Sequence, residues 1–265
     1  MINLERRIET ADKAELLWGG DVPTAGTALV LAHAHTGTAS GFTPLLRILH
    51  RPALVWNRRG YGGSTRGTGY SHITQEEDLL LLLDHLRLMT VDLVGLAAGG
   101  ACMAAFAARW PQRVHRLVLI SSFLGQTAEF WQTATGHAAV VGAPADKELS
   151  PAFRASPDAV GWIAAAEVNR LARAGEPQQP CSVSLCDLQP VRDLHIWTGA
   201  EDRLFTPAML RHSARLLPHA ATAVMPAVAH AAPVENPALV ARWLARLDEG
   251  KDLSFVSQTL GEGPR

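Results

Sequence analysis

One stretch decides the fold of this chain: Val91-Asp92-Leu93-Val94-Gly95-Leu96-Ala97-Ala98-Gly99-Gly100. It begins as an apolar and β-branched run, then breaks into small residues that lead into a helical pattern over residues 98–109. A strand that turns sharply into a helix needs glycines, because no side chain fits inside such a bend. The stretch therefore predicts a buried strand that enters a helix through a tight turn.

The same alternation of strand and helix runs through the rest of the chain. A hairpin is expected over residues 8–18, and helices over 42–49, 75–88 and 237–247. Residues 28–32 are a continuous apolar run, typical of a strand buried on both faces, and further core strands are expected over residues 53–56, 116–121, 194–198 and 221–225. Strands and helices that alternate at this spacing predict a mostly parallel sheet with right-handed crossovers. We therefore expect an α/β fold, a three-layer α/β/α sandwich.

The alternation is interrupted once, over residues 123–192. This segment has helical patterns at 127–135 and 159–174, several prolines and no strong buried strand. We interpret it as a helical lid inserted into a core formed by residues 1–122 and 193–247. Residues 248–265 are polar and are predicted to form a loose tail.

Composition limits the classes of partner. The 265 residues are 48% hydrophobic and 18% charged, with a formal net charge of -1, which fits one globular domain and argues against nucleic acid or an anionic membrane surface. There is no apolar signal core and no run that could span a bilayer, and the three cysteines form no disulfide pattern. A cytoplasmic protein that binds a small molecule is expected, and a homodimer stays open. No metal or organic cofactor is expected, because H-E-x-x-H and G-x-G-x-x-G are both absent.

Three landmarks carry a family resemblance. Gly95-x-Ala97-x-Gly99 has the frame of the nucleophile elbow G-x-S-x-G, residues 198–202 end a strand in Gly-x-x-Asp, and His230 follows the last strand. In this order they resemble the α/β-hydrolase fold superfamily, whose triad runs nucleophile, acid, histidine. Residues 33–35, 59–64 and 110–114 also match motifs of that family.

The resemblance implies a role for each matched position. Position 97 would carry the nucleophile, here alanine; His230 would be the general base, and Asp202 would orient it. The backbone N–H groups of His35 and Ala98 would form the oxyanion hole. The simpler alternatives are that His230 is a surface-loop histidine and Asp202 a turn residue.

Alanine at the nucleophile position leaves three explanations open. The first is an inactivating Ser→Ala variant of a hydrolase that cleaves a carboxylic ester, lactone, thioester or activated C–C bond of a small to medium hydrophobic substrate. The second is a native alanine in an enzyme that uses the His230–Asp202 dyad for cofactor-free acid/base chemistry, lyase-like or oxygenase-like. The third is a non-catalytic member that binds a ligand. Among lid residues, Trp131, His137 and Trp162 could line an apolar pocket or simply pack.

Overall fold

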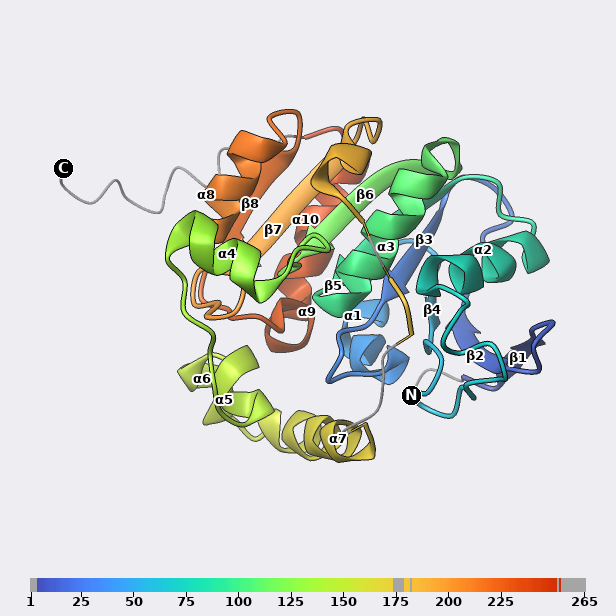
Figure 1. Ribbon diagram of the computed structural model, residues 1–265, viewed down its shortest axis with the longest axis horizontal. Helices are drawn as coiled ribbons and strands as arrows, with labels where there is room; N and C mark the ends of the chain where they lie inside the picture. The colour runs from blue at the N-terminus through green and yellow to red at the C-terminus, as the bar shows by residue number, and fades with distance from the viewer. Residues whose placement is uncertain (1–3, 174–178, 182, 252, 254–265) are drawn as a thin grey trace.

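The computed structural model describes residues 4–173, 179–181, 183–251 and 253, which form one sheet covered by helices (Figure 1). The sheet has eight strands in the order β1-β2-β4-β3-β5-β6-β7-β8. The strands are β1 (Arg6–Glu9), β2 (Glu15–Gly20), β3 (Ala28–Ala32), β4 (Ala53–Trp56), β5 (Val91–Leu96), β6 (Val114–Ile120), β7 (Leu194–Gly199) and β8 (Ala221–Met225). The β1–β2 hairpin is antiparallel and joins antiparallel to β4, whereas β3 to β8 pair in parallel. The predicted α/β class is confirmed.

The central strands of the sheet are buried on both faces. Every residue of β3, β4 and β5 is buried, which explains why β3 and β4 are continuous apolar runs; in β5 the run is broken by the buried Asp92. Helices cover both faces. The helices α2 (Gln75–His85), α3 (Ala98–Arg109) and α8 (Pro207–Leu216) share one apolar core, and α1 (Thr43–Leu46) and α10 (Pro237–Asp248) share the other. The molecule is therefore the expected three-layer sandwich.

The segment between β6 and β7, residues 123–192, is hereafter called the insertion. Its elements are α4 (Ala128–Thr135), α5 (Pro144–Glu148), α6 (Pro151–Arg154), α7 (Ala159–Ala172) and the short 3₁₀ helix η3 (Leu185–Leu188), and its described residues form no strand. The helix α4 packs beside α8, where Trp131 is fully buried against Phe205. The helices α5, α6 and α7 lie beyond the ends of the strands, below α3 and α9 (Ala232–Glu235) in Figure 1. A lid function for these helices stays a prediction.

The C-terminal end of the chain is partly described. Asp248, where the predicted loose tail begins, is the last residue of α10. Its carboxylate pairs with Arg51 at 2.8 Å and with Arg116 at 2.9 Å, so it is tied to the core. Residue 252 and residues 254–265 lie outside the described part of the chain.

Candidate active site

The tight turn predicted at the end of β5 is present, with Ala97 at its apex. The backbone of Ala97 has φ 51° and ψ -114°, a left-handed φ that is uncommon for any residue except glycine. The flanking glycines are required by close backbone contact. A Cβ on Gly99 would lie 2.3 Å from the Ala32 carbonyl oxygen, and one on Gly95 would lie 2.4 Å from the Gly100 Cα. The chain therefore keeps a strained nucleophile-elbow turn, with a methyl group where the family has a hydroxyl.

A buried carboxylate and a buried histidine meet beside this turn. Asp202 follows β7 and His230 follows β8, and His230 Nδ1 lies 3.0 and 3.1 Å from the two carboxylate oxygens of Asp202. Asp202 Oδ1 also accepts from the N–H groups of Leu204 and Phe205, at 2.8 and 2.9 Å. These contacts fix the carboxylate, and the carboxylate in turn fixes the imidazole with Nδ1 as the donor. Nε2 is thereby left for proton transfer.

The electrostatics of His230 follow from its neighbours. Complete burial alone would lower its pKa, because it disfavours the charged imidazolium. The Asp202 charge, the hydrogen bond to it and the more distant Glu148 and Glu235 carboxyls outweigh burial, so the pKa of His230 is raised above its ordinary value. The site therefore stabilises a protonated histidine, as a group that accepts a proton during a reaction requires.

The loop that follows β3 is held by side chains on its carbonyl oxygens. Arg58 Nη2 donates to the Ala34 oxygen at 3.2 Å, Arg173 Nη2 to the His35 oxygen at 2.6 Å, and Asn169 Nδ2 to the Thr36 oxygen at 3.0 Å. In a trans peptide the C=O and the next N–H point in opposite directions. Fixing the Ala34 carbonyl from outside therefore turns the His35 N–H the other way. Within the described residues neither this N–H nor that of Ala98 has a protein acceptor.

The His35 side chain belongs to a cationic cluster below the loop. Its Nδ1 lies 2.7 Å from the Tyr61 hydroxyl, and the guanidinium carbons of Arg58 and Arg173 lie 4.6 and 3.7 Å from the Tyr61 ring centroid. Burial, followed by these two positive charges, lowers the pKa of His35 to about 4. The side chain is neutral at physiological pH, so a proton carrier in this site would be His230 and not His35.

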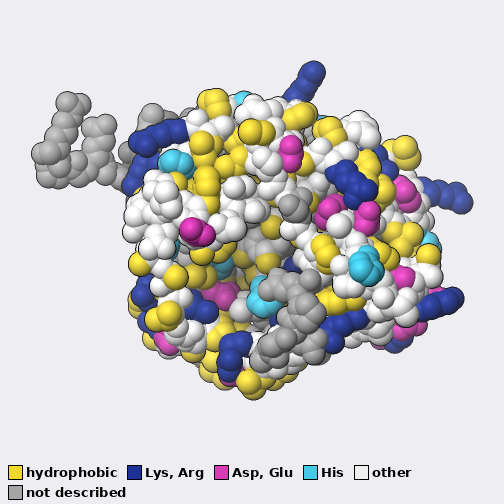
Figure 2. All heavy atoms as spheres, in the orientation of Figure 1, with side chains coloured by type: hydrophobic (Ala, Val, Ile, Leu, Met, Phe, Trp, Pro, Cys, Tyr) yellow, Lys and Arg dark blue, Asp and Glu magenta, His cyan; other side chains and the backbone are white. Residues whose placement is uncertain are grey.

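One cavity brings the predicted residues together. Ala97, Ala98, His35 and His230 all line a cavity of about 470 Å³, hereafter the elbow cavity, and Asp202 lies behind His230. Figure 2 shows this face of the molecule hollowed near its centre, with histidine and acidic side chains visible in the hollow. Around the hollow, acidic and basic side chains are interspersed. The five positions expected from the sequence thus form a single constellation.

Other residues of the site escaped the sequence analysis. Glu148 lines the elbow cavity from α5, and Arg173 and Asn169 reach the β3 loop from the end of α7. All three belong to the insertion, more than a hundred residues from the loop that they contact. No motif marks them; the only available signal is that buried carboxyls and arginines are unusual and seldom lack a partner. Of the three lid residues singled out earlier, Trp131 packs in the core and only Trp162 lines a described cavity.

Among the described residues no group of three or more His, Cys, Asp or Glu side chains is arranged to hold a metal ion. In the same part of the chain no helix combines the length and apolar character that crossing a membrane requires.

Comparison with known proteins agrees with the fold. Residues 27–141 match the model of the alpha/beta hydrolase fold family. A solved thermophilic esterase from Thermogutta terrifontis superposes with a TM-score of 0.74 at 21% identity, over 92% of this chain and 98% of that one. The enol-lactonase from Burkholderia xenovorans gives 0.71 at 19% identity, over 89% and 97%. Together with the elbow turn, these matches show that the chain has the α/β-hydrolase fold, and that residues 27–141 resemble that family in sequence.

Curated relatives match over a shorter stretch. A Bacillus subtilis protein assigned provisionally as a 2-succinyl-6-hydroxy-2,4-cyclohexadiene-1-carboxylate synthase is 32% identical over 122 residues, 44% of each chain. The 2-hydroxy-6-oxo-2,4-heptadienoate hydrolase of Pseudomonas putida is 37% identical over 105 residues, 37% of this chain and 38% of that protein. The match thus spans less than half the length of these relatives.

Proposed function

We propose that this chain has the site of a serine-type α/β-hydrolase whose nucleophile position is occupied by Ala97. The observation that carries the proposal is the buried His230–Asp202 pair, which faces the same cavity as the strained elbow turn. In this proposal the chain as given binds its substrate without acylation, and a serine at position 97 would be the nucleophile of the parent form.

Each residue then has a chemical task. His230 Nε2 would take the proton from a hydroxyl at position 97 while Asp202 stabilises the imidazolium. The alkoxide would attack a substrate carbonyl, and the N–H groups of His35 and Ala98 would hold the oxyanion. Water activated by His230 would release the acyl group. The helices α5 to α7 would cover the substrate as a lid.

The substrate class follows from the cavity and from the relatives. The printed names of the relatives and structural neighbours include an oxo-dienoate hydrolase, an esterase and an enol-lactonase. These names support a carboxylic ester, lactone, thioester or activated C–C bond as the reacting group. A cavity of about 470 Å³ suits a small to medium molecule.

A second candidate is proton-transfer chemistry with alanine as the native residue. It is favoured by the fact that His230, whose proton-accepting geometry is complete, needs no serine to move a proton. This candidate predicts that the chain as given turns over a substrate and that His230→Ala abolishes the turnover.

The experiment that tests the main proposal needs no known substrate. Ala97→Ser, the chain as given and the double variant Ala97→Ser/His230→Ala are exposed to a fluorophosphonate probe, and peptide mass spectrometry locates the adduct. We expect labelling at position 97 in the single variant only, because His230 is needed to activate the serine.

The outcomes separate the candidates. Labelling that persists without His230 would contradict its role as the base. A folded Ala97→Ser protein that stays unlabelled would overturn the proposal of a serine-hydrolase site and leave proton-transfer chemistry or ligand binding. The latter two are then separated by turnover of an ester and diketone panel.

A further inference from the structure

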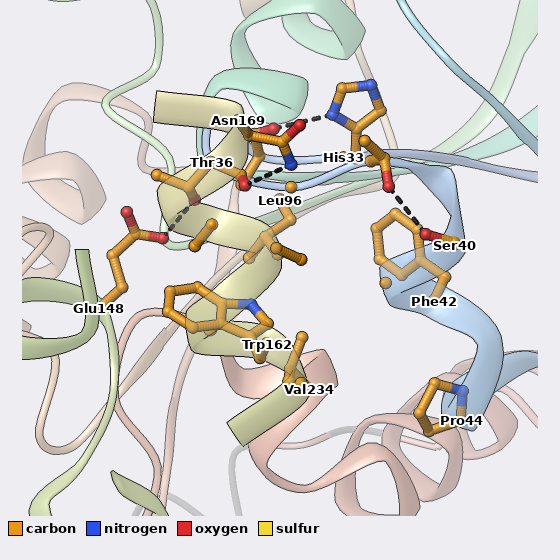
Figure 3. A pocket seen from close by; sticks show the side chains of 18 of the residues that line it. His33, Thr36, Ser40, Phe42, Pro44, Leu96, Glu148, Trp162, Asn169 and Val234 are labelled. Atoms are coloured by element: carbon orange, nitrogen blue, oxygen red, sulfur yellow. Dashed lines mark hydrogen bonds between the residues drawn. The ribbon is translucent and has the colours of Figure 1, made fainter. Parts of the chain in front are cut away.

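A second cavity of about 280 Å³ adjoins the elbow cavity and is hereafter called the side chamber (Figure 3). It lies between the β3 loop, the first turns after it (Thr38 to Pro44) and helix α7. Figure 3 shows Glu148 and Trp162 on neighbouring sides of the chamber and Phe42 on another. Ala34, Thr36 and Glu148 line both cavities, so they form the wall that the two spaces share.

The side chamber is lined by two acidic residues. Glu148 is buried in its wall and Asp158 lies exposed at its edge, whereas no lysine or arginine among the described residues lines it. His33, the one histidine in the lining, is occupied at both nitrogens: Nδ1 contacts the Ala34 oxygen at 2.8 Å and Nε2 accepts from the Arg58 N–H at 3.2 Å. Burial keeps the pKa of His33 well below its usual value, so this ring is neutral. A cavity lined by one sign of charge concentrates ligands of the opposite sign.

One carboxyl oxygen of Glu148 has no hydrogen-bond partner within the described residues. The side chain is 6% exposed, and its Oε2 accepts from the Thr36 hydroxyl at 2.7 Å. Within the described residues Oε1 has neither a hydrogen bond nor a salt bridge. Burial raises the pKa of this carboxyl against the opposing effects of His230, Thr36 and Lys147. A buried carboxylate with one neutral partner costs free energy that a cationic ligand would recover.

The other polar groups of the chamber also favour a cation. Asn169 uses its Nδ2 on the Thr36 oxygen, and its Oδ1 has no partner among the described residues, so it offers an acceptor. Trp162 and Phe42 add aromatic rings, whose faces attract organic cations. Carboxyl, amide oxygen and aromatic rings together complement an ammonium group better than an anion or a neutral alkyl group.

We propose that the side chamber binds a small organic ammonium group, with Glu148 as its counter-ion and Trp162 as its aromatic wall. Because the two cavities share a wall, a substrate could place an ammonium group in the side chamber and its carbonyl in the elbow cavity. That assignment of the substrate class, a carbonyl compound that carries an ammonium group, rests on the proposed function. The binding of the cation itself does not.

The test uses the whole chain as given and two probes of equal shape. Choline and its uncharged carbon isostere, 3,3-dimethylbutan-1-ol, are titrated by calorimetry or by ligand-observed NMR. We expect choline to bind about tenfold or more tightly than the alcohol, in the range expected for a desolvated cation on an aromatic ring. Glu148→Gln, which keeps the shape and the Thr36 contact, should bring the two affinities within about twofold of each other. Glu167→Gln, which removes an exposed carboxylate of helix α7 that does not line the side chamber, is the matched control and should change nothing.

Each result decides the proposal. Equal affinity of the two probes for the given chain, no choline binding, or a choline preference that survives Glu148→Gln would overturn it. If Glu148→Gln does not fold, as judged by circular dichroism, Trp162→Leu is the second test, because this side chain is only half-buried. It should weaken choline several-fold and leave the alcohol unchanged; an equal loss for both probes would contradict the aromatic wall. Since the given chain needs no nucleophile for this test, its failure is distinct from a failure of the fluorophosphonate experiment.

Discussion

Among the neighbours that raise the pKa of His230, Asp202 has the largest effect. Asp202 is itself held by two backbone N–H groups, so its carboxylate cannot turn away from the ring. Burial lowers the pKa of His230, and the Asp202 charge and hydrogen bond are the main effects that raise it. Removing that charge should therefore reverse the direction of the pKa shift.

We therefore predict that Asp202→Asn lowers the pKa of His230. The measurement is an NMR titration of the His230 ring signals in the given chain and in the variant, with the other histidine signals as internal references. A folded Asp202→Asn protein in which the His230 titration is unmoved would show that the pair is not electrostatically coupled.

The same coupling sets the sign of the pH effect on stability. A histidine whose pKa is raised by folding contributes stability in full below the unfolded value of about 6.5 and loses it as the pH rises through the folded pKa. The loss of unfolding free energy above pH 6.5 should therefore be smaller in Asp202→Asn than in the given chain.

At the residue level, three of the site residues could be predicted from the sequence. Ala97, Asp202 and His230 are predicted through a resemblance: the elbow frame, the Gly-x-x-Asp strand end and the histidine after the last strand resemble motifs of the α/β-hydrolase fold superfamily. Glu148 and Arg173 are not, because their places depend on how the insertion folds back on the sheet. Neither residue lies in a recognisable sequence motif, and only the folded structure shows that both side chains are buried next to the site.

At the scale of elements, the important contact joins helix α7 to the β3 loop. Two of the three loop carbonyls that are held by side chains are held from α7 and its C-terminal cap, by Asn169 and Arg173. The insertion thus orients the two peptides that follow His35 in the chain, next to the Ala34–His35 peptide whose N–H belongs to the proposed oxyanion hole.

We predict that Arg173→Met, made in the Ala97→Ser background, slows fluorophosphonate labelling by about tenfold. The loss should be smaller than for deletion of an oxyanion donor, because the His35 N–H stays present and Arg58 still holds its peptide through the Ala34 carbonyl, so that only the next peptide is freed. The matched control is Arg170→Met one turn earlier. Arg170 is exposed and pairs only with Glu167, so labelling should keep its rate.

Equal rates in the two arginine variants would contradict a positioning role for Arg173. A structural loss alone is recognised by a lowered fraction of labelled protein at an unchanged rate constant, since an unfolded fraction does not react.

The elements themselves were predictable to different degrees. Strands β3 and β4 stand out because burial on both faces leaves an uninterrupted apolar run, and β5 to β7 are mostly apolar with a charged or histidine residue near their start. The short helices α5 and α6 are set by a proline at their first turn and by packing on neighbouring segments, so periodicity gives no signal for them.

At the scale of the whole molecule, a buried ion-pair network links the antiparallel β1–β2 hairpin to the parallel part of the fold. Arg59 is almost fully buried and donates both to Asp78 on α2, at 2.7 Å, and to Asp12 in the β1–β2 turn. It also donates to the Arg66 carbonyl oxygen at 2.8 Å. One guanidinium thus connects the hairpin, the loop after β4 and α2.

We predict that Arg59→Met destabilises the protein by about 3–5 kcal/mol, because it leaves the buried Asp78 carboxylate without its cation. Urea unfolding followed by circular dichroism measures the change. Arg7→Met, which breaks an exposed pair with Glu15, should stay within about 1 kcal/mol of the given chain. Similar losses for the two variants would mean that burial of the network adds nothing.

The contacts between α7 and the β3 loop also bear on modularity. If the insertion only covered the site, exchange of residues 123–192 for the corresponding segment of a relative would change the specificity and leave the core intact. Here the graft would remove Asn169 and Arg173 together, and the His35 and Thr36 carbonyls would lose the donors that orient them. A chimera of this protein would need a donor segment with an amide and a guanidinium at the same two places, or a redesigned loop.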